Sequence, residues 1–214
     1  MRLIGLAGPA RAGKDTVADY LVGKYGFKKF SFSDRLYEEV AAAFEIDPSE
    51  LNDPLTKDQP TICLADCLDR AFYDVAHKKV CEEVINVAGF QVWTGHVSPR
   101  FLLQTWGTEY RRAQDPDYWI KCAKRWVVRQ LTDALPSLYT VKIVNTSVRY
   151  PNEAQWIRES GGFMWHVTRD ECPVVRAHSS EIPVPKSVND VTLKNHSSRE
   201  ALYQQVDEAV RYYE

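Results

Sequence analysis

Gly8-Pro9-Ala10-Arg11-Ala12-Gly13-Lys14 joins an apolar run to a segment with helical spacing. The run from Leu3 to Ala7 predicts a buried strand, and the apolar positions between Lys14 and Tyr25 predict a helix that Gly26 ends. Glycines at the first and sixth positions let such a loop wrap its own N–H groups around phosphate oxygens, and the lysine adds a positive charge. The stretch therefore predicts a nucleoside-triphosphate site, but it does not distinguish a kinase from an ATPase or a switch.

The two residues after Lys14 bear on the metal that accompanies a triphosphate. Asp15 occupies the position where a serine or threonine commonly touches Mg²⁺ directly, and Thr16 follows it. We therefore expect Asp15 and Thr16 to hold Mg²⁺ through water. The candidate ATP- and phosphate-binding residues are Gly8, Arg11, Ala12, Gly13, Lys14, Asp15 and Thr16.

Strands and helices are expected to alternate along the rest of the chain. Strands are expected at about 29–33, 139–144, 163–168 and 191–193, and helices at 34–44, 61–87, 98–110, 116–134, 151–160 and after the capping box Ser197-Ser198-Arg199-Glu200. This pattern predicts the α/β class, with a parallel sheet of about five strands covered by helices on both faces. Together with the phosphate loop it predicts a P-loop kinase fold. We expect one domain, 1–214, with a helical lid or substrate-binding insertion at about 46–135.

Length and composition are ordinary for a globular protein: 214 residues, 44% of them hydrophobic and 26% charged. The formal net charge of −2 argues against polymeric nucleic acid as a partner, although a local basic cluster can still hold a small anion. The N-terminal apolar run is too short for a signal sequence, and no stretch approaches the length of a membrane span. We expect a cytoplasmic protein with no membrane association and with small-molecule nucleotides as partners.

Five cysteines, an odd number, favour free thiols in a reducing compartment. Cys63 and Cys67, together with His77 and Cys81, form two pairs at helical spacing that could bind zinc. The short-loop spacing typical of zinc sites is missing, so buried free thiols are the competing interpretation.

Several further stretches carry a resemblance to a known family. They are Phe32-Ser33-Asp34-Arg35-Leu36, Pro99 to Gln104 with Gly107-Thr108-Glu109, Arg112 and Trp119, Val148-Arg149-Tyr150-Pro151-Asn152-Glu153, and His178-Ser179-Ser180-Glu181 before Asp190 to Asn195. In this order and spacing the chain resembles the bacteriophage deoxynucleoside monophosphate kinases, from Arg2 to about Val210. The resemblance implies a nucleoside monophosphate kinase-like fold, magnesium-ATP as phosphoryl donor and a deoxynucleotide as acceptor. It also implies a homodimer, in the host cytoplasm if the protein is encoded by a phage.

The chain departs from the family pattern at one position. Members usually carry an acidic residue just before the Val-Arg pair, and here Ser147 occupies that place before Val148 and Arg149. A serine brings no charge to a metal-bound water. We therefore expect Asp15 and Asp34, rather than this strand, to contribute carboxylates near the phosphates.

Phosphoryl transfer needs positioning and cations around the transferred group rather than covalent chemistry. We expect Lys14, Arg112, Arg149 and Asp34 to be catalytic. The expected substrate-binding residues are Asp34, Arg100, Gln104, Glu109, Arg112 and Trp119. Competing interpretations are a helix N-cap for Asp34, a core position for Trp119 and a solvated charge for any single arginine, Arg111 above all.

The segment from Ser98 to Trp119 is expected to act as a lid. Two helices there meet near Arg111 to Pro116, a break that could serve as a hinge. Closure would exclude water and bring Arg100 and Arg112 to the transferred group. The proline-rich stretch 46–60 is expected to form the opposing wall.

Three functions are compatible with these residues. The leading one is a deoxynucleoside monophosphate kinase, which converts ATP and a dNMP to ADP and a dNDP. The second is a P-loop kinase acting on a hydroxymethylated base within phage DNA, which would need a basic groove. The third is a nucleotide-binding module without turnover, and Ser147 is the feature in its favour. The bases that the acceptor site takes do not follow from the sequence.

Overall fold

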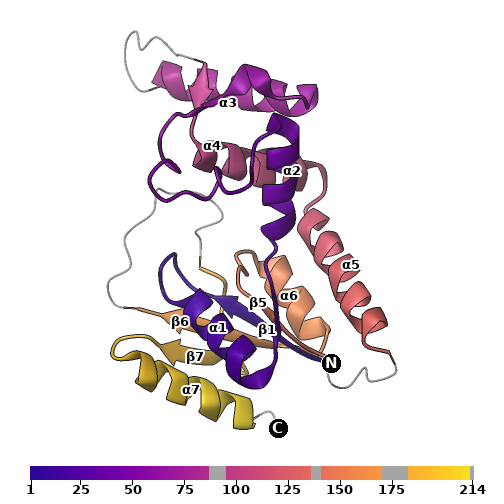
Figure 1. Ribbon diagram of the computed structural model, residues 1–214, viewed down its shortest axis with the longest axis vertical. Helices are drawn as coiled ribbons and strands as arrows, with labels where there is room; N and C mark the ends of the chain where they lie inside the picture. The colour runs from indigo at the N-terminus through magenta and orange to yellow at the C-terminus, as the bar shows by residue number, and fades with distance from the viewer. Residues whose placement is uncertain (87–94, 136–140, 170–182, 213–214) are drawn as a thin grey trace. The chain divides into compact units, whose positions relative to one another are not determined.

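The computed structural model describes residues 1–86, 95–135, 141–169 and 183–212 (Figure 1). Two compact units are distinguished: a sheet unit, residues 1–32 and 120–214, and a helical unit, residues 33–119. The chain passes between them twice. The insertion expected at about 46–135 overlaps the helical unit, and the single-domain organisation stays a prediction.

The sheet unit is built on five parallel strands in the order β2-β5-β1-β6-β7. The strands are β1 (Arg2–Ala7), β2 (Lys28–Phe30), β5 (Lys142–Asn145), β6 (Phe163–Thr168) and β7 (Val191–Lys194). The first strand is central because β1 pairs with β5 on one side, where Gly5 lies opposite Asn145, and with β6 on the other, where Gly5 lies opposite Met164. A loop at the carboxyl end of β1 is therefore flanked by the ends of two other strands.

Helices cover both faces of this sheet (Figure 1). They are α1 (Lys14–Tyr25), α6 (Pro151–Glu159), α7 (Arg199–Tyr212) and α5 (Tyr118–Asp133), most of which belongs to this unit. Ile4 and Leu6 share one buried cluster with residues of α1 and α7, whereas a Cβ on Gly5 would lie 2.4 Å from the Ile157 side chain of α6. Successive residues of β1 thus face opposite layers, which explains its continuous apolar character. The predicted α/β P-loop kinase fold is confirmed.

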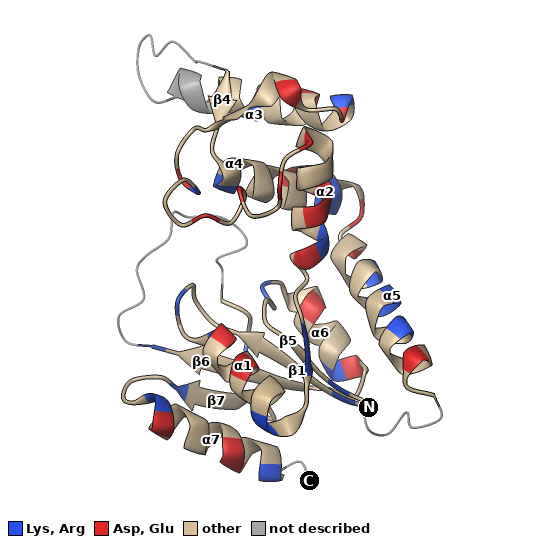
Figure 2. Cartoon of the chain, in the orientation of Figure 1, with Lys and Arg blue, Asp and Glu red and all other residues tan. Residues whose placement is uncertain are grey.

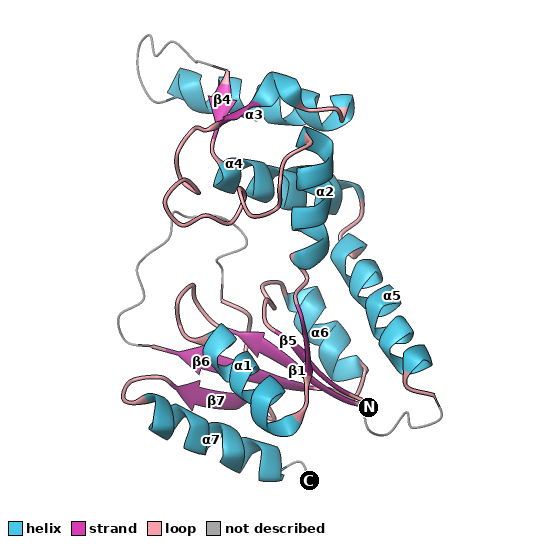
Figure 3. Ribbon diagram, in the orientation of Figure 1, coloured by secondary structure: helices cyan, strands magenta, loops and turns pink. Residues whose placement is uncertain are grey.

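The helical unit contains α2 (Asp34–Phe44), α3 (Arg70–Asn86), α4 (Pro99–Gln104) and the π-helical stretch η2 (Thr105–Arg112) (Figure 3). Ser98 caps α4 as the sequence predicts, because its side chain accepts a hydrogen bond from Phe101 N at 3.1 Å.

The prediction of a helix at 61–87 is wrong in its first part. There β3 (Ile62–Cys63) pairs with β4 (His96–Val97), and the short 3₁₀ helix η1 (Leu64–Asp66) follows β3. Strands of two residues show too little alternation to be recognised in a sequence.

One buried carboxylate organises the helical unit. Glu39 of α2 accepts hydrogen bonds from Trp106 Nε1 at 3.0 Å, Arg111 Nε at 2.8 Å and the Tyr118 hydroxyl at 2.5 Å, and Arg35 Nε lies 3.3 Å away. Burial acts to raise the pKa of Glu39, but hydrogen bonds from Tyr118, Trp106 and Arg111 outweigh it and hold that pKa below its ordinary value. Arg111 also stacks on the rings of Trp106 and Tyr118. Arg111 therefore links α2 to η2 and to Tyr118. This structural role agrees with its being the weakest candidate among the arginines for substrate binding.

Replacing this carboxylate should destabilise the protein. We expect Glu39→Ala to lower the free energy of unfolding by about 3 kcal/mol, because the Arg111 guanidinium would lose its partner in a largely buried setting. Glu38→Ala is the matched control, since Glu38 is exposed and pairs with Arg35 at the surface, a contact worth less than about 1 kcal/mol. Urea unfolding followed by circular dichroism gives both values, and equal losses in the two variants would contradict the role of Glu39.

Candidate active site

The phosphate loop depends on two glycines for space as well as conformation. Gly8 has φ +143° and Gly13 has φ +104°, values that side-chain-bearing residues rarely adopt. A Cβ on Gly8 would lie 2.2 Å from Val167 O, and one on Gly13 would lie 2.5 Å from Asn195 Nδ2. The glycines are therefore required by the neighbouring strand ends, in addition to the room that a phosphate would need.

Lys14 is the first residue of α1, and its side chain returns to the loop. Its Nζ donates hydrogen bonds to Gly8 O and Pro9 O, each at 2.8 Å. The positive charge is thus held at the loop, where the N-terminus of α1 adds its own positive end. This is the place that the sequence assigns to phosphate oxygens.

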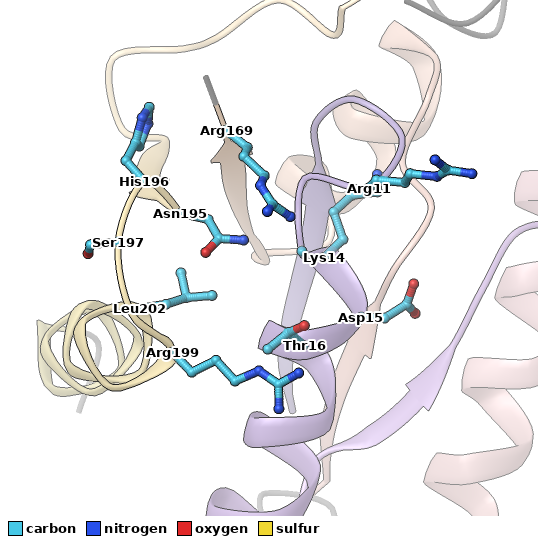
Figure 4. A pocket seen from close by; sticks show the side chains of 11 residues that line it. Arg11, Lys14, Asp15, Thr16, Arg169, Asn195, His196, Ser197, Arg199 and Leu202 are labelled. Carbon is cyan, nitrogen blue, oxygen red and sulfur yellow. The ribbon is translucent and has the colours of Figure 1, made fainter. Parts of the chain in front are cut away.

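A cavity of about 660 Å³ opens on one flank of the loop (Figure 4). Its walls are the loop, the end of β6 and the turn between β7 and α7, and its basic residues are Arg11, Lys14, Arg169 and Arg199. Figure 4 shows Arg199 extending towards Thr16 and Arg169 directed towards the loop. Sequence reasoning missed Arg169 and Arg199, which are more than 150 positions from the loop and reach it only through the sheet order.

A second cavity of about 320 Å³ lies on the other flank. Its lining includes Lys14, Arg149, His166, Val184 and Lys186. Lys14 lines both cavities, and the structure places Arg149 beside it within the same unit. The loop therefore has a cationic site on each side.

The Ser147 side chain forms hydrogen bonds within the protein. Its Oγ lies 2.5 Å from Ser31 Oγ and accepts a hydrogen bond from Phe32 N at 2.9 Å. It is 8% exposed, and it lines neither of the two cavities formed by the described residues. This serine therefore joins the segments that follow β2 and β5.

The candidate metal-binding residues suit magnesium better than zinc. Asp15 and Thr16 line the larger cavity and offer hard oxygen atoms, and Asp15 also pairs with Lys29 at 3.0 Å. Throughout the described part of the chain no three His, Cys, Asp or Glu side chains gather to hold a metal ion, so the structure gives no support to zinc. Cys63, Cys67 and Cys81 are free thiols, and burial raises the pKa of Cys67 to about 11.

The remaining predicted site residues all lie in the helical unit. Asp34 is exposed at the start of α2, whose N-cap is Ser33. Arg100 pairs with Asp58 at 2.5 and 3.2 Å, within the stretch expected to form a wall.

Four more of these residues lie on α4, η2 and the first turn of α5. Glu109 pairs with Lys79, and Gln104 and Arg112 are half-buried. Trp119 is 4% exposed and donates from Nε1 to Gly107 O at 3.1 Å, as a core residue would. Whether these residues meet Lys14 and Arg149 in one site stays a prediction. His178, Ser180 and Glu181 lie outside the described residues.

A buried network anchors the chain where it enters β7. Asp190 accepts hydrogen bonds from Arg158, at 2.5 Å from the nearer nitrogen, and from Ser187 N at 2.8 Å, and His166 Nε2 lies 3.0 Å from it. Burial lowers the pKa of His166 below its ordinary value, although the bond to Asp190 acts in the opposite direction. His166 is therefore neutral near pH 7 in the folded protein, at the edge of the smaller cavity.

A family model described as deoxynucleotide monophosphate kinase matches residues 59–206. The chain belongs to the deoxynucleotide monophosphate kinase family. The Escherichia phage RB69 protein named deoxynucleotide monophosphate kinase is 24% identical over 254 residues, covering 99% of this chain and 100% of the phage protein. A protein of Acanthamoeba polyphaga mimivirus that bears the same family name is 26% identical over 237 residues, covering 96% of this chain and 94% of the viral one.

Among solved structures, dephospho-CoA kinase from Campylobacter jejuni aligns over 100% of this chain and 98% of its own, with 11% identity and a TM-score of 0.44. The resemblance that the motifs carry is confirmed by the family match. Family membership and the phosphate loop make this chain an ATP-dependent nucleotide kinase. No helix among the described residues has both the length and the apolarity needed to cross a membrane.

The state of His166 predicts how this kinase responds to acid. A pKa lower in the folded than in the unfolded chain means that unfolding takes up a proton as the pH falls below the ordinary value of 6.5. We expect the thermal unfolding midpoint to fall between pH 7.5 and pH 5.5, and His166→Gln to reduce that fall. His96→Gln, at an exposed histidine, is the matched control. Calorimetry across this range is the measurement, and identical slopes for wild type and His166→Gln would contradict the assignment.

Proposed function

We propose that this enzyme transfers the γ-phosphoryl group of magnesium-ATP to a deoxynucleoside monophosphate. The observation that carries the proposal is that Lys14 stands between two cationic cavities at the carboxyl ends of the strands. A phosphate oxygen of the acceptor attacks the γ-phosphorus, the bond between that phosphorus and the β,γ-bridging oxygen breaks, and the products are a dNDP and ADP. Such a reaction needs a donor on one side of the loop and an acceptor on the other.

The larger cavity suits the donor. The loop N–H groups and Lys14 would receive the β- and γ-phosphates, while Arg169 and Arg199 supply further charge on the same flank. Asp15 and Thr16 would hold Mg²⁺ mainly through water, because one carboxylate and one hydroxyl leave most of the six coordination positions of the ion to water and phosphate oxygens. The metal, when bound, neutralises charge on the phosphates.

The smaller cavity suits the phosphate of the acceptor. Arg149 lines it beside Lys14, so both cations can face the transferred group from within the sheet unit. We assign Asp34, Arg100, Gln104, Glu109 and Arg112 to acceptor binding, and we expect closure of the predicted lid, Ser98 to Trp119, to bring Arg100 and Arg112 to the transferred group. Trp119 would support these residues from the core of that unit, given its buried indole.

A homodimer is part of the proposal, on the basis of the family resemblance alone. Light scattering of the purified protein tests it. A monomer at micromolar concentration would remove this part of the proposal and leave the phosphoryl transfer untouched.

One feature favours the alternative acceptor, a base within DNA. Lys121, Lys124, Arg125 and Arg129 give α5 a row of exposed basic residues (Figure 2). A coupled assay of ADP release across the four common dNMPs and a hydroxymethylated DNA duplex separates the alternatives. We expect turnover with at least one dNMP and none with the duplex. Turnover with the duplex alone would overturn the proposal, and ATP binding without turnover on any acceptor would favour a binding module.

Removal of the loop lysine should abolish transfer while the protein stays folded. We expect Lys14→Ala to lower kcat/KM by about three orders of magnitude, or about 4 kcal/mol, because the lysine neutralises charge that develops on the transferred phosphates. Lys28→Ala is the control, since the Lys28 side chain is exposed and donates to Gln130 at the surface. Near-normal turnover by a folded Lys14→Ala protein would refute the donor site.

Arg112 should act on the rate of transfer rather than on ATP binding. We expect Arg112→Ala to lower kcat by about a thousandfold with little change in the Kd for ATP, and to raise the share of ATP lost to water. Arg70→Ala is the control, because Arg70 is exposed on α3 and pairs with Asp74. Single-turnover kinetics with labelled ATP measures both products, and a loss confined to ATP affinity would contradict the assignment.

A further inference from the structure

Asn195, immediately after β7, is bound to the phosphate loop. Its Nδ2 donates a hydrogen bond to Ala12 O at 2.9 Å, and its backbone N donates to Thr168 O at 2.8 Å. The residue is thus fixed to the end of β6 by its main chain and to the loop by its side chain. Figure 4 shows the Asn195 amide directed towards the loop, next to the Arg169 side chain.

This hydrogen bond acts on a single peptide group of the loop. The peptide between Ala12 and Gly13 is planar and trans, so its carbonyl and its N–H point in opposite directions. Holding Ala12 O against Asn195 therefore directs the Gly13 N–H away from Asn195. The N–H groups at this end of the loop are those that a phosphate-binding loop uses.

The contact is also close enough to fix the position of the loop. A Cβ on Gly13 would lie 2.5 Å from Asn195 Nδ2, so the amide packs directly against the α-carbon of Gly13. β7 itself is held at its other end, where Asp190 bonds to Arg158 and His166. The strand therefore has a fixed point at each end, and one of them is the loop.

We propose that Asn195 is a positioning residue for phosphoryl transfer, which holds the Ala12–Gly13 peptide in the orientation that binds the phosphates of ATP. The proposal rests on the proposed function in taking ATP as the ligand of the loop. Asn195 acts through the loop backbone and not by contact with the transferred group. Its loss should therefore weaken donor binding and leave acceptor binding alone.

Two substitutions test the role. Asn195→Leu keeps the branched shape of the side chain without the donor, and Asn195→Ala removes both. Asn189→Ala is the matched control, an exposed asparagine at the other end of β7. The measurements are the Kd for magnesium-ATP by calorimetry, KM for ATP and for the accepted dNMP, kcat, and the unfolding midpoint without ligand.

We expect both Asn195 variants to raise the Kd and KM for ATP by about fivefold to tenfold, the effect of one hydrogen bond, with KM for the dNMP unchanged. Asn189→Ala should match wild type. Wild-type ATP affinity in Asn195→Leu would overturn the proposal, as would variants whose only change is a lower unfolding midpoint. A parallel rise in KM for the dNMP would show a general structural role and would also overturn it.

The outcomes separate this proposal from the proposed function. If wild type binds magnesium-ATP but phosphorylates no dNMP, the acceptor assignment fails, and the Kd values alone decide the role of Asn195. If wild type transfers phosphate and the Asn195 variants bind ATP as it does, the role of Asn195 fails and the kinase assignment stands. If wild type does not bind magnesium-ATP, both fail.

Discussion

The close approach of Gly8 to the end of β6 is the contact on which the site depends. A side chain on Gly8 would collide with Val167 O, so only a glycine lets the chain turn out of β1 at this point. That turn places the loop between the ends of β5 and β6, and α1 starts directly behind it. Both cavities exist because the loop stands between them, and Lys14 reaches both because it begins that helix.

The sequence predicts the parts of the site that are local. β1, the loop and α1 follow one another within 25 residues, and apolar periodicity and glycine spacing are sufficient to place them. Arg169 and Arg199 reach the same cavity from distant parts of the chain, and no local pattern marks them as ligands. Their role depends on β6 and β7 lying next to β1 in the sheet, which is a property of the tertiary structure. The pairing of β3 with β4 was not predicted for a different reason, because strands of two residues are too short to show an alternating pattern.

Arg111 shows that a basic residue next to a predicted catalytic one can have a structural role. Consecutive residues on a helix point in different directions, so neighbours need not share surroundings. Arg111 pairs with the buried Glu39 and stacks on aromatic rings, which commits its charge to the core of the helical unit. The π-helical turn shifts the direction of each residue in this stretch, so α-helical periodicity does not tell which arginine faces inward. The residue type alone does not distinguish Arg111 from Arg112, although their surroundings differ.

A net charge of −2 is compatible with a strongly basic site because charge acts over short distances. At physiological ionic strength, exposed charges more than about 8 Å apart are largely screened from one another. The cations that matter are therefore those gathered around the loop, and acidic residues elsewhere on the chain do little to offset them. Lys14 is held there by two neutral carbonyl oxygens, Gly8 O and Pro9 O. A phosphate oxygen is a charged and stronger acceptor, so the lysine can turn to it without leaving the loop. The N–H groups of the loop also act over short distances, and they bind a phosphate well only when their directions are fixed before it arrives. The hydrogen bond from Asn195, next to β7, to Ala12 O fixes one of these directions.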